Sequence, residues 1–105
     1  MFKVFRLQEF EDLIDKKLTY EERERVEKIE EEIAEVGFTG KPLGLRSLRE
    51  KRLAGKRVYF IIYDDLKVAL MVAVSDKKTQ LVTIDKIKTF LPEYRVVAEK
   101  MLETT

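Results

Sequence analysis

The residues best suited to chemistry stand in the middle of the chain, where an arginine alternates with tyrosines along a predicted strand. Because side chains alternate across a strand, Arg57, Tyr59 and Tyr63 share one face of the segment 57–63. An arginine beside tyrosines suits contact with a phosphate next to a stacked base. The other face of this strand is apolar and must belong to a core: Val58, Phe60 and Ile62.

Further cations reach this face only if the loops between neighbouring strands have the right length. With three residues in each loop, Leu53 lies opposite Arg57, and Lys51 lies beside Tyr59. A two-residue loop would instead turn Lys51 to the opposite face. The predicted site assumes the three-residue register, which gives a shallow floor ringed by cations. In that register the other pairs are Arg49 with Ile61, Tyr63 with Lys67 and Met71 with Tyr59, and the cations are Arg49, Lys51, Arg57 and Lys77.

Each of these features also has a purely structural interpretation. Lysines and arginines on an exposed strand keep an edge solvated and discourage aggregation. Taken alone, Tyr59 and Tyr63 are more often half-buried packing residues than binding residues. Lys77 and Lys78 alone resemble an ordinary solvated turn, and the glutamates at 30–32 a solvated helix face. We assign no metal to these glutamates.

The composition excludes several classes of site. The 105 residues contain no cysteine and no histidine, so there is no disulfide framework, and a zinc site would need carboxylates alone. Without histidine, a catalyst in this chain must use lysine, arginine, tyrosine or a carboxylate for proton transfer. We therefore predict neither a metal nor a cofactor.

Charge is distributed unevenly along the chain, although the net charge is only +1. Residues 1–39 hold seven basic and twelve acidic side chains, whereas residues 40–80 hold ten basic and four acidic ones. This cationic middle attracts a polyanionic partner at short range. The longest apolar run, Val68 to Val74, is too short for a membrane span, and the start of the chain shows no secretory signal. We expect a cytoplasmic protein without a membrane partner.

The first half of the chain predicts one strand and a helical hairpin. A short strand covers 2–5, and apolar residues recur at helical spacing from Leu7 to Leu18. Thr19 stands three residues before Glu22, which is the pattern of a capping box at the start of a second helix. Gly37 is a suitable C-cap for that helix.

The second half predicts three strands and a helical end. A turn over 40–44 leads into strands over 47–53, 57–63 and 67–75, and helical spacing returns from Thr79. Pro92 either breaks that helix or opens another. The predicted fold class is α+β in the order β-α-α-β-β-β-α, as one domain over 1–105. A mostly antiparallel sheet packs on one face against an N-terminal helical hairpin and a C-terminal helix.

The stretch from Gly40 to Ile87 resembles the RelE/ParE toxin superfamily. The pattern consists of a GKPL loop, a basic LREKR strand, a GKRVYF strand, an acidic turn, and an apolar strand that ends in SDKKTQ. The preceding strand and helical hairpin agree with it, so the resemblance covers nearly the whole chain. It implies a RelE-like toxin of a type II toxin–antitoxin module.

Ribosome-dependent members of this superfamily cut mRNA in the ribosomal A site without a metal. The ribose 2′-hydroxyl attacks the adjacent phosphodiester, which leaves a cyclic phosphate and a free 5′-hydroxyl. By motif position, Arg57 resembles the arginine that stabilises the phosphate, and the other cations resemble the basic groups around it. The resemblance implies the catalytic residues Lys51, Arg57 and Lys77, and the RNA-binding residues Arg49, Arg52, Tyr59 and Lys78.

The sequence departs from the superfamily pattern after the last strand. Several relatives carry a tyrosine or histidine there, whereas this chain offers Gln80 and Thr83. The residues left to act as a base are Tyr59, Tyr63, Tyr94 or a lysine among other cations.

Two alternatives to an mRNA endoribonuclease therefore stay open: a ParE-like inhibitor that binds DNA gyrase, and a degenerate protein that retains only antitoxin binding. The implied partners are a RelB-like antitoxin, the ribosome and mRNA; a homodimer is not predicted.

Overall fold

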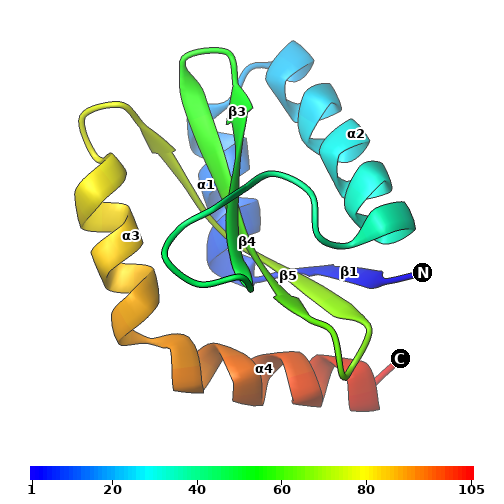
Figure 1. Cartoon of the computed structure of the whole chain (residues 1–105). Coiled ribbons are helices and arrows are strands. Elements are labelled where there is room, and N and C mark those ends of the chain that lie inside the picture. The colour runs from blue at the N-terminus through cyan, green and yellow to red at the C-terminus, as the bar shows by residue number, and fades with distance from the viewer.

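A five-stranded mixed sheet forms the middle of the molecule in the computed structural model, which describes residues 1–105 (Figure 1). The strands lie in the order β1-β5-β4-β3-β2. β1 runs parallel to β5, and the other neighbours are antiparallel, so the predicted mostly antiparallel sheet is confirmed. The strands are β1 (Lys3–Arg6), β2 (Lys41–Pro42), β3 (Leu48–Leu53), β4 (Lys56–Tyr63) and β5 (Val68–Asp76).

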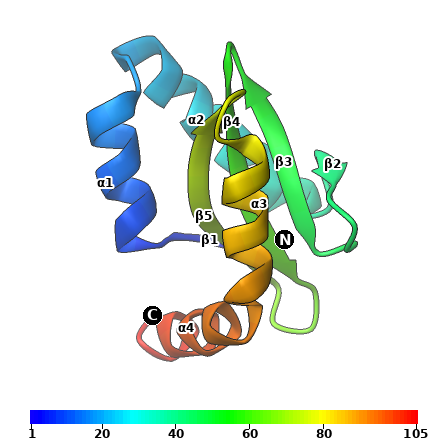
Figure 2. The same ribbon diagram turned by 90° about the vertical axis from the view of Figure 1, so that its left-hand side faces the viewer.

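Four helices cover the sheet on both faces (Figures 1 and 2). α1 (Gln8–Lys17) and α2 (Tyr20–Val36) pack on one face; α3 (Gln80–Thr89) and α4 (Leu91–Glu103) pack on the other. The prediction of helices on one face only was wrong. β4 and β5 bury most of their residues, including consecutive ones, so both faces must be covered by apolar neighbours.

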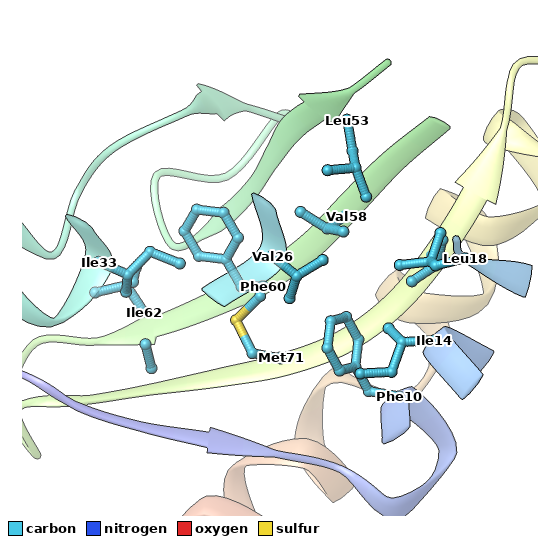
Figure 3. Close-up of a cluster of buried hydrophobic side chains, with 12 residues drawn as sticks. Phe10, Ile14, Leu18, Val26, Ile33, Leu53, Val58, Phe60, Ile62 and Met71 are labelled. Atoms are coloured by element: carbon cyan, nitrogen blue, oxygen red, sulfur yellow. The ribbon is translucent and has the colours of Figure 1, made fainter. Parts of the chain in front are cut away.

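The first core lies between the sheet and the N-terminal hairpin (Figure 3). Val58, Phe60 and Ile62 point into it, as the alternation of β4 predicted, and meet Phe10 and Ile33 from the hairpin. The second core lies on the opposite face, where α3 and α4 cover Leu48, Tyr59, Ile61 and Leu70. The functional residues described below lie beside this second core.

Capping residues at both ends of α2 explain where this helix begins and ends. Thr19 Oγ1 accepts a hydrogen bond from the Glu22 amide at 3.2 Å, and Glu22 Oε1 accepts one from the Thr19 amide at 2.9 Å. The predicted capping box is therefore confirmed. Gly37 follows the helix with a φ of +71°, and a Cβ on it would clash with the Phe2 ring. Pro92 stands in the first turn of α4, so it opens a new helix.

The hairpin between β3 and β4 has a two-residue loop, so the predicted three-residue register was wrong. Leu53 pairs with Lys56, and Glu50 pairs with Tyr59. The turn is tight because Ala54 adopts a φ of +54°, and two-residue turns of this kind match the twist of the strands. The next loop has four residues, and Tyr63 pairs with Val68 rather than with Lys67.

A β-bulge reverses the faces of the last part of β5. Tyr59 lies opposite Ala73 and Phe60 opposite Met71, which leaves Val72 as an extra residue. The predicted pairing of Met71 with Tyr59 was therefore wrong. Because of this extra residue, Ser75 stands on the Tyr59 face instead of on the Met71 face. The bulge thus directs the end of β5 and the following turn toward Arg57, which pairs with Ser75.

Candidate functional site

The two-residue hairpin separates the cations that the sequence had placed together. Arg52 pairs with Arg57, and Arg49 pairs with Phe60. Alternation then puts Glu50, Arg52 and Arg57 on the face of α3, and Arg49 on the face of α2. Lys51 follows Arg49 to that face. The predicted convergence of Arg49 and Lys51 with Arg57 on one floor was wrong.

Arg49 is held by the loop that precedes β3. Its Nε donates to the Arg46 carbonyl at 2.8 Å, and its Nη1 donates to the Gly40 carbonyl at 3.1 Å. Its guanidinium also lies 5.3 Å from the centre of the Phe38 ring. These contacts satisfy the side chain and give it a structural role in this loop.

Lys51 and Lys56 on the α2 face are paired with glutamates of α2. Lys51 forms an ion pair with Glu32, and Lys56 lies 3.0 Å from Glu22 Oε1. Hydrogen bonding to Lys51 lowers the pKa of Glu32, while the Thr19 amide, and then Lys56, lower the pKa of Glu22. The acidic helix therefore neutralises the cations on this side of the sheet.

The other face carries an open pocket of about 390 Å³ without a single hydrophobic residue in its wall. Four of its seven lining residues are cationic, and one is acidic. Arg52, Arg57 and Glu50 come from the strands, and Lys51 borders the pocket from the edge of β3. The full lining is Gly40, Lys41, Glu50, Lys51, Arg52, Arg57 and Gln80. A polar, positively charged hollow of this kind suits an anion rather than an apolar ligand.

Arg57 occupies the most constrained position in this pocket. Its side chain is 12% exposed, and its Nε lies 3.7 Å from Glu50 Oε2. That separation makes an ion pair but exceeds hydrogen-bond length, and the buried Nε has no hydrogen-bond partner. A buried donor without an acceptor is uncommon in folded proteins because it loses its hydration without replacement. The Nε itself is out of reach of a ligand, but the exposed part of the guanidinium lines the pocket and keeps donor capacity for a ligand oxygen.

A second hollow of about 190 Å³ adjoins the first, because both are lined by Arg52 and Arg57. Lys77, from the turn after β5, also lines this second hollow. The two strand arginines and Lys77 are therefore brought together, while Lys78 of the same turn is exposed and lines neither hollow. The pairing of Lys56 with Asp76 explains this meeting, since it holds the hairpin and the turn at one end of the sheet.

The turn that carries Lys77 is fixed by hydrogen bonds between its two ends. Asp76 Oδ1 accepts from the Thr79 amide at 2.9 Å and from the Thr79 hydroxyl at 3.0 Å. The same hydroxyl accepts from the Asp76 amide at 3.2 Å. These bonds, the amide bond first, lower the pKa of the Asp76 carboxyl. A rigid turn gives Lys77 a defined position.

The tyrosines do not take the place that the sequence predicted. Tyr59 is fully buried, and its hydroxyl lies 2.7 Å from Ser75 Oγ, so it has no surface on which a base could stack. Burial raises the pKa of Tyr59 and Tyr94, and it raises the pKa of Tyr63 to about 12. All three phenols are therefore protonated at neutral pH.

Three pocket residues escaped the sequence analysis: Lys41, Glu50 and Gln80. Glu50 and Arg52 stand two residues apart in β3, so their side chains share a face in any register. This alternation could have predicted a carboxylate beside Arg52, although Glu50 is surrounded by basic residues in the sequence. Gln80 opens α3, and its Nε2 lies 3.5 Å from Glu50 Oε2. Neither a carboxylate nor an amide was expected among these cations.

Comparison with known proteins finds similarity in structure only. No family model and no curated protein matches this chain. A variant of the E. coli toxin RelE bound to a peptide of the antitoxin RelBc matches with a TM-score of 0.65 at 18% identity. That alignment covers 81% of this chain and 93% of the toxin. The chain has the RelE fold.

Isolated E. coli RelE toxin gives nearly the same result as the complexed variant. Its TM-score is 0.64 at 17% identity, over 83% of this chain and 99% of the toxin. The predicted RelE-like α+β architecture is thus confirmed. No helix of this RelE-fold chain is long and apolar enough to cross a membrane.

Proposed function

We propose that this chain is the toxin of a type II toxin–antitoxin module and acts as an endoribonuclease on ribosome-bound mRNA. The observation that carries the proposal is the meeting of Arg52, Arg57 and Lys77 at one end of a RelE-fold sheet. Arg57 lines both hollows, and no protein acceptor lies within hydrogen-bond distance of its Nε. These groups have the charge and the hydrogen-bonding capacity that a phosphodiester requires.

In the proposed reaction the ribose 2′-hydroxyl gives its proton to a base while its oxygen bonds to the adjacent phosphorus, and the bond from phosphorus to the 5′-oxygen breaks. Negative charge grows on the two non-bridging oxygens, where Arg57 and Arg52 donate hydrogen bonds. Lys77 gives a proton to the leaving 5′-oxygen, which ends as a free hydroxyl. The other product is a cyclic phosphate. No step in this scheme needs a metal ion.

The remaining cations of the region bind the RNA chain on either side of the cleaved bond. Lys41 stands at the rim of the larger pocket, and Lys78 stands in the turn next to Lys77. Lys51 also borders that pocket, but its charge is paired with Glu32, so it is left out of this role. Phosphate contacts of this kind position a strand without reading its sequence. Arg49 and Tyr59 have no part in the proposal, because one is held by its loop and the other is buried.

The proposed partner is a RelB-like antitoxin that binds the cytoplasmic toxin and blocks this pocket. An acidic segment of the antitoxin would pair with the free cations Arg52 and Lys77, which are both exposed. One neighbour in the comparison is a toxin in complex with an antitoxin peptide, which supports a partner of this kind.

A second candidate is a ParE-like protein that binds DNA gyrase without catalysis. It is favoured by the ion pair between Glu50 and Arg57, because a carboxylate reduces the positive charge available to a phosphate. Expression of the chain alone separates the two functions. We expect growth arrest with cuts in translated mRNA, mapped by primer extension. Arrest with DNA-damage induction and intact mRNA would instead establish the gyrase inhibitor.

A further inference from the structure

The cationic pocket contains one carboxylate, and its position is unexpected for an RNA-binding surface. Glu50 lies on the pocket wall with only 5% of its surface exposed. Around it stand Lys41, Arg52 and Arg57. A negative group in such a pocket repels phosphate, so it weakens RNA binding unless it takes part in the reaction.

Glu50 does not have the geometry of a group that only neutralises an arginine. In the two arginine pairs with the shortest contacts, the carboxylate receives two short hydrogen bonds from the guanidinium. Arg6 donates to Glu30 at 2.8 and 2.7 Å, and Arg95 donates to Asp65 at 2.9 and 2.7 Å.

By contrast, Glu50 Oε2 lies 3.7 Å from Arg57 Nε and 3.5 Å from Gln80 Nε2, so its contacts are long. Its oxygens keep lone pairs with which they can accept a proton.

Glu50 is also the acceptor that the pocket otherwise lacks. The chain has no histidine, and burial keeps the phenols of Tyr59, Tyr63 and Tyr94 protonated. The other charged groups around the pocket are lysines and arginines, which donate hydrogen bonds. A proton taken from a 2′-hydroxyl therefore has one anionic acceptor here.

We propose that Glu50 is the general base of the phosphodiester cleavage, an inference that rests on the proposed ribonuclease function. One Glu50 oxygen removes the proton of the 2′-hydroxyl while the 2′-oxygen forms its bond to phosphorus. The bond from phosphorus to the 5′-oxygen breaks, and that oxygen takes a proton from Lys77. Solvent then removes the proton from Glu50 and returns one to Lys77, so the enzyme is restored.

The spacing in the pocket fits this assignment. Before attack, the reacting oxygen and phosphorus lie roughly 3 Å apart. Glu50 Oε2, which would contact the attacking oxygen, lies 3.7 Å from the Nε of Arg57, and the rest of that guanidinium lines the pocket where the phosphate would bind. Glu50 can thus contact the attacking 2′-oxygen of a nucleotide while Arg57 contacts the adjacent phosphate. Gln80 Nε2 lies 3.5 Å from the same carboxylate oxygen.

The test compares the native chain with Glu50→Gln, which keeps the shape of the side chain and removes its basicity. Cleavage of mRNA on programmed ribosomes is measured as a single-turnover rate at saturating protein, with binding measured separately. For Glu50→Gln we expect the cleavage rate to fall by about 10²-fold or more. Ribosome binding should be as tight as that of the native chain, or tighter. Glu24→Gln, an exposed glutamate of α2, serves as the matched control and keeps the native rate.

Two further measurements separate a base from a structural role. The native rate rises with pH through the titration of one acidic group, and Glu50→Gln loses that rise. Formate added to Glu50→Ala restores part of the rate, because a small carboxylate fits the open pocket of about 390 Å³.

A Glu50→Gln rate within threefold of native, or a faster one, overturns the general base and leaves the ribonuclease function intact. A native protein that binds ribosomes but cuts no mRNA overturns both.

Discussion

Arg57 Nε and Glu50 Oε2 lie 3.7 Å apart at the wall of the cationic pocket, with both side chains largely buried. Adjacent strands supply the two residues, and the two-residue hairpin places them on one face. The pair is close enough for mutual electrostatic stabilisation but too distant for a hydrogen bond. Arg57 is therefore held in place without a short hydrogen bond to Glu50, and its guanidinium lines the pocket.

The first prediction concerns this arginine. Arg57→Ala should lower the rate of mRNA cleavage by about 10²-fold or more, because it removes the donor that faces the developing phosphate charge. Arg57→Lys keeps the charge but loses the planar fork, so an intermediate rate is expected. Single-turnover cleavage on programmed ribosomes is the measurement.

Lys100→Ala is the matched control, since Lys100 is an exposed cation on α4 outside both hollows. Thermal unfolding of Arg57→Ala shows whether an unpaired Glu50 destabilises the fold. A folded Arg57→Ala protein with the native cleavage rate would remove Arg57 from the mechanism.

Two neighbouring lysines provide the second prediction. Lys77 lines the smaller hollow with Arg52 and Arg57, whereas Lys78 lines neither hollow. Lys77→Ala should lower the cleavage rate by about 10²-fold if its ammonium protonates the leaving oxygen. Lys78→Ala should mainly weaken RNA binding and its dependence on salt. Equal effects of the two substitutions on the rate would show that this turn contributes charge only.

The sequence was sufficient for the elements whose signals are local. The capping box at Thr19 and Glu22 predicted the start of α2, and the alternation of Val58, Phe60 and Ile62 predicted the inner face of β4. Pro92 marked the boundary between the two last helices. Each of these depends on a few neighbouring residues, so the pattern alone defines the structure.

The composition of the site depended on features that such patterns do not contain. Ala54 adopts a positive φ, and the β3–β4 loop has one residue fewer than predicted. In the resulting register Arg49 and Lys51 lie on the face opposite to the predicted one. The bulge at Val72 turned the end of β5 toward Arg57. Tyr59 looked half-exposed on the polar side of its strand, but packing of α3 and α4 buries it. Register and tertiary cover decided which side chains meet.

The third prediction contrasts two buried tyrosines. The Tyr59 hydroxyl is hydrogen-bonded to Ser75, whereas the Tyr63 hydroxyl is buried without a partner. Tyr59→Phe should lower the free energy of unfolding by about 1 kcal/mol, because Ser75 loses its bond. Tyr63→Phe should leave it unchanged or raise it, because it removes an unsatisfied polar group. Chemical denaturation of the two variants at neutral pH measures the difference.

The raised pKa of Tyr63 gives the fourth prediction. Burial raises this pKa to about 12, against roughly 10 for a free phenol. The folded state therefore favours the protonated phenol. Its contribution to stability is present below about pH 10 and is lost as the pH rises toward the folded value. Tyr63→Phe should consequently lose less stability than the native chain above about pH 10, as measured by thermal unfolding across that range.

A fifth prediction compares two glycines in turns. Gly37 has a φ of +71°, and a Cβ there would clash with the Phe2 ring, whereas nothing lies within 4 Å of a Cβ on Gly55. Gly37→Ala should therefore lower the free energy of unfolding by about 2 kcal/mol, through backbone strain and displacement of Phe2. Gly55→Ala should change it by roughly 0.5 kcal/mol or less, since the exposed turn accepts a methyl group. Similar losses in both variants would show that the end of α2 yields to the methyl group, and that Phe2 is not fixed there.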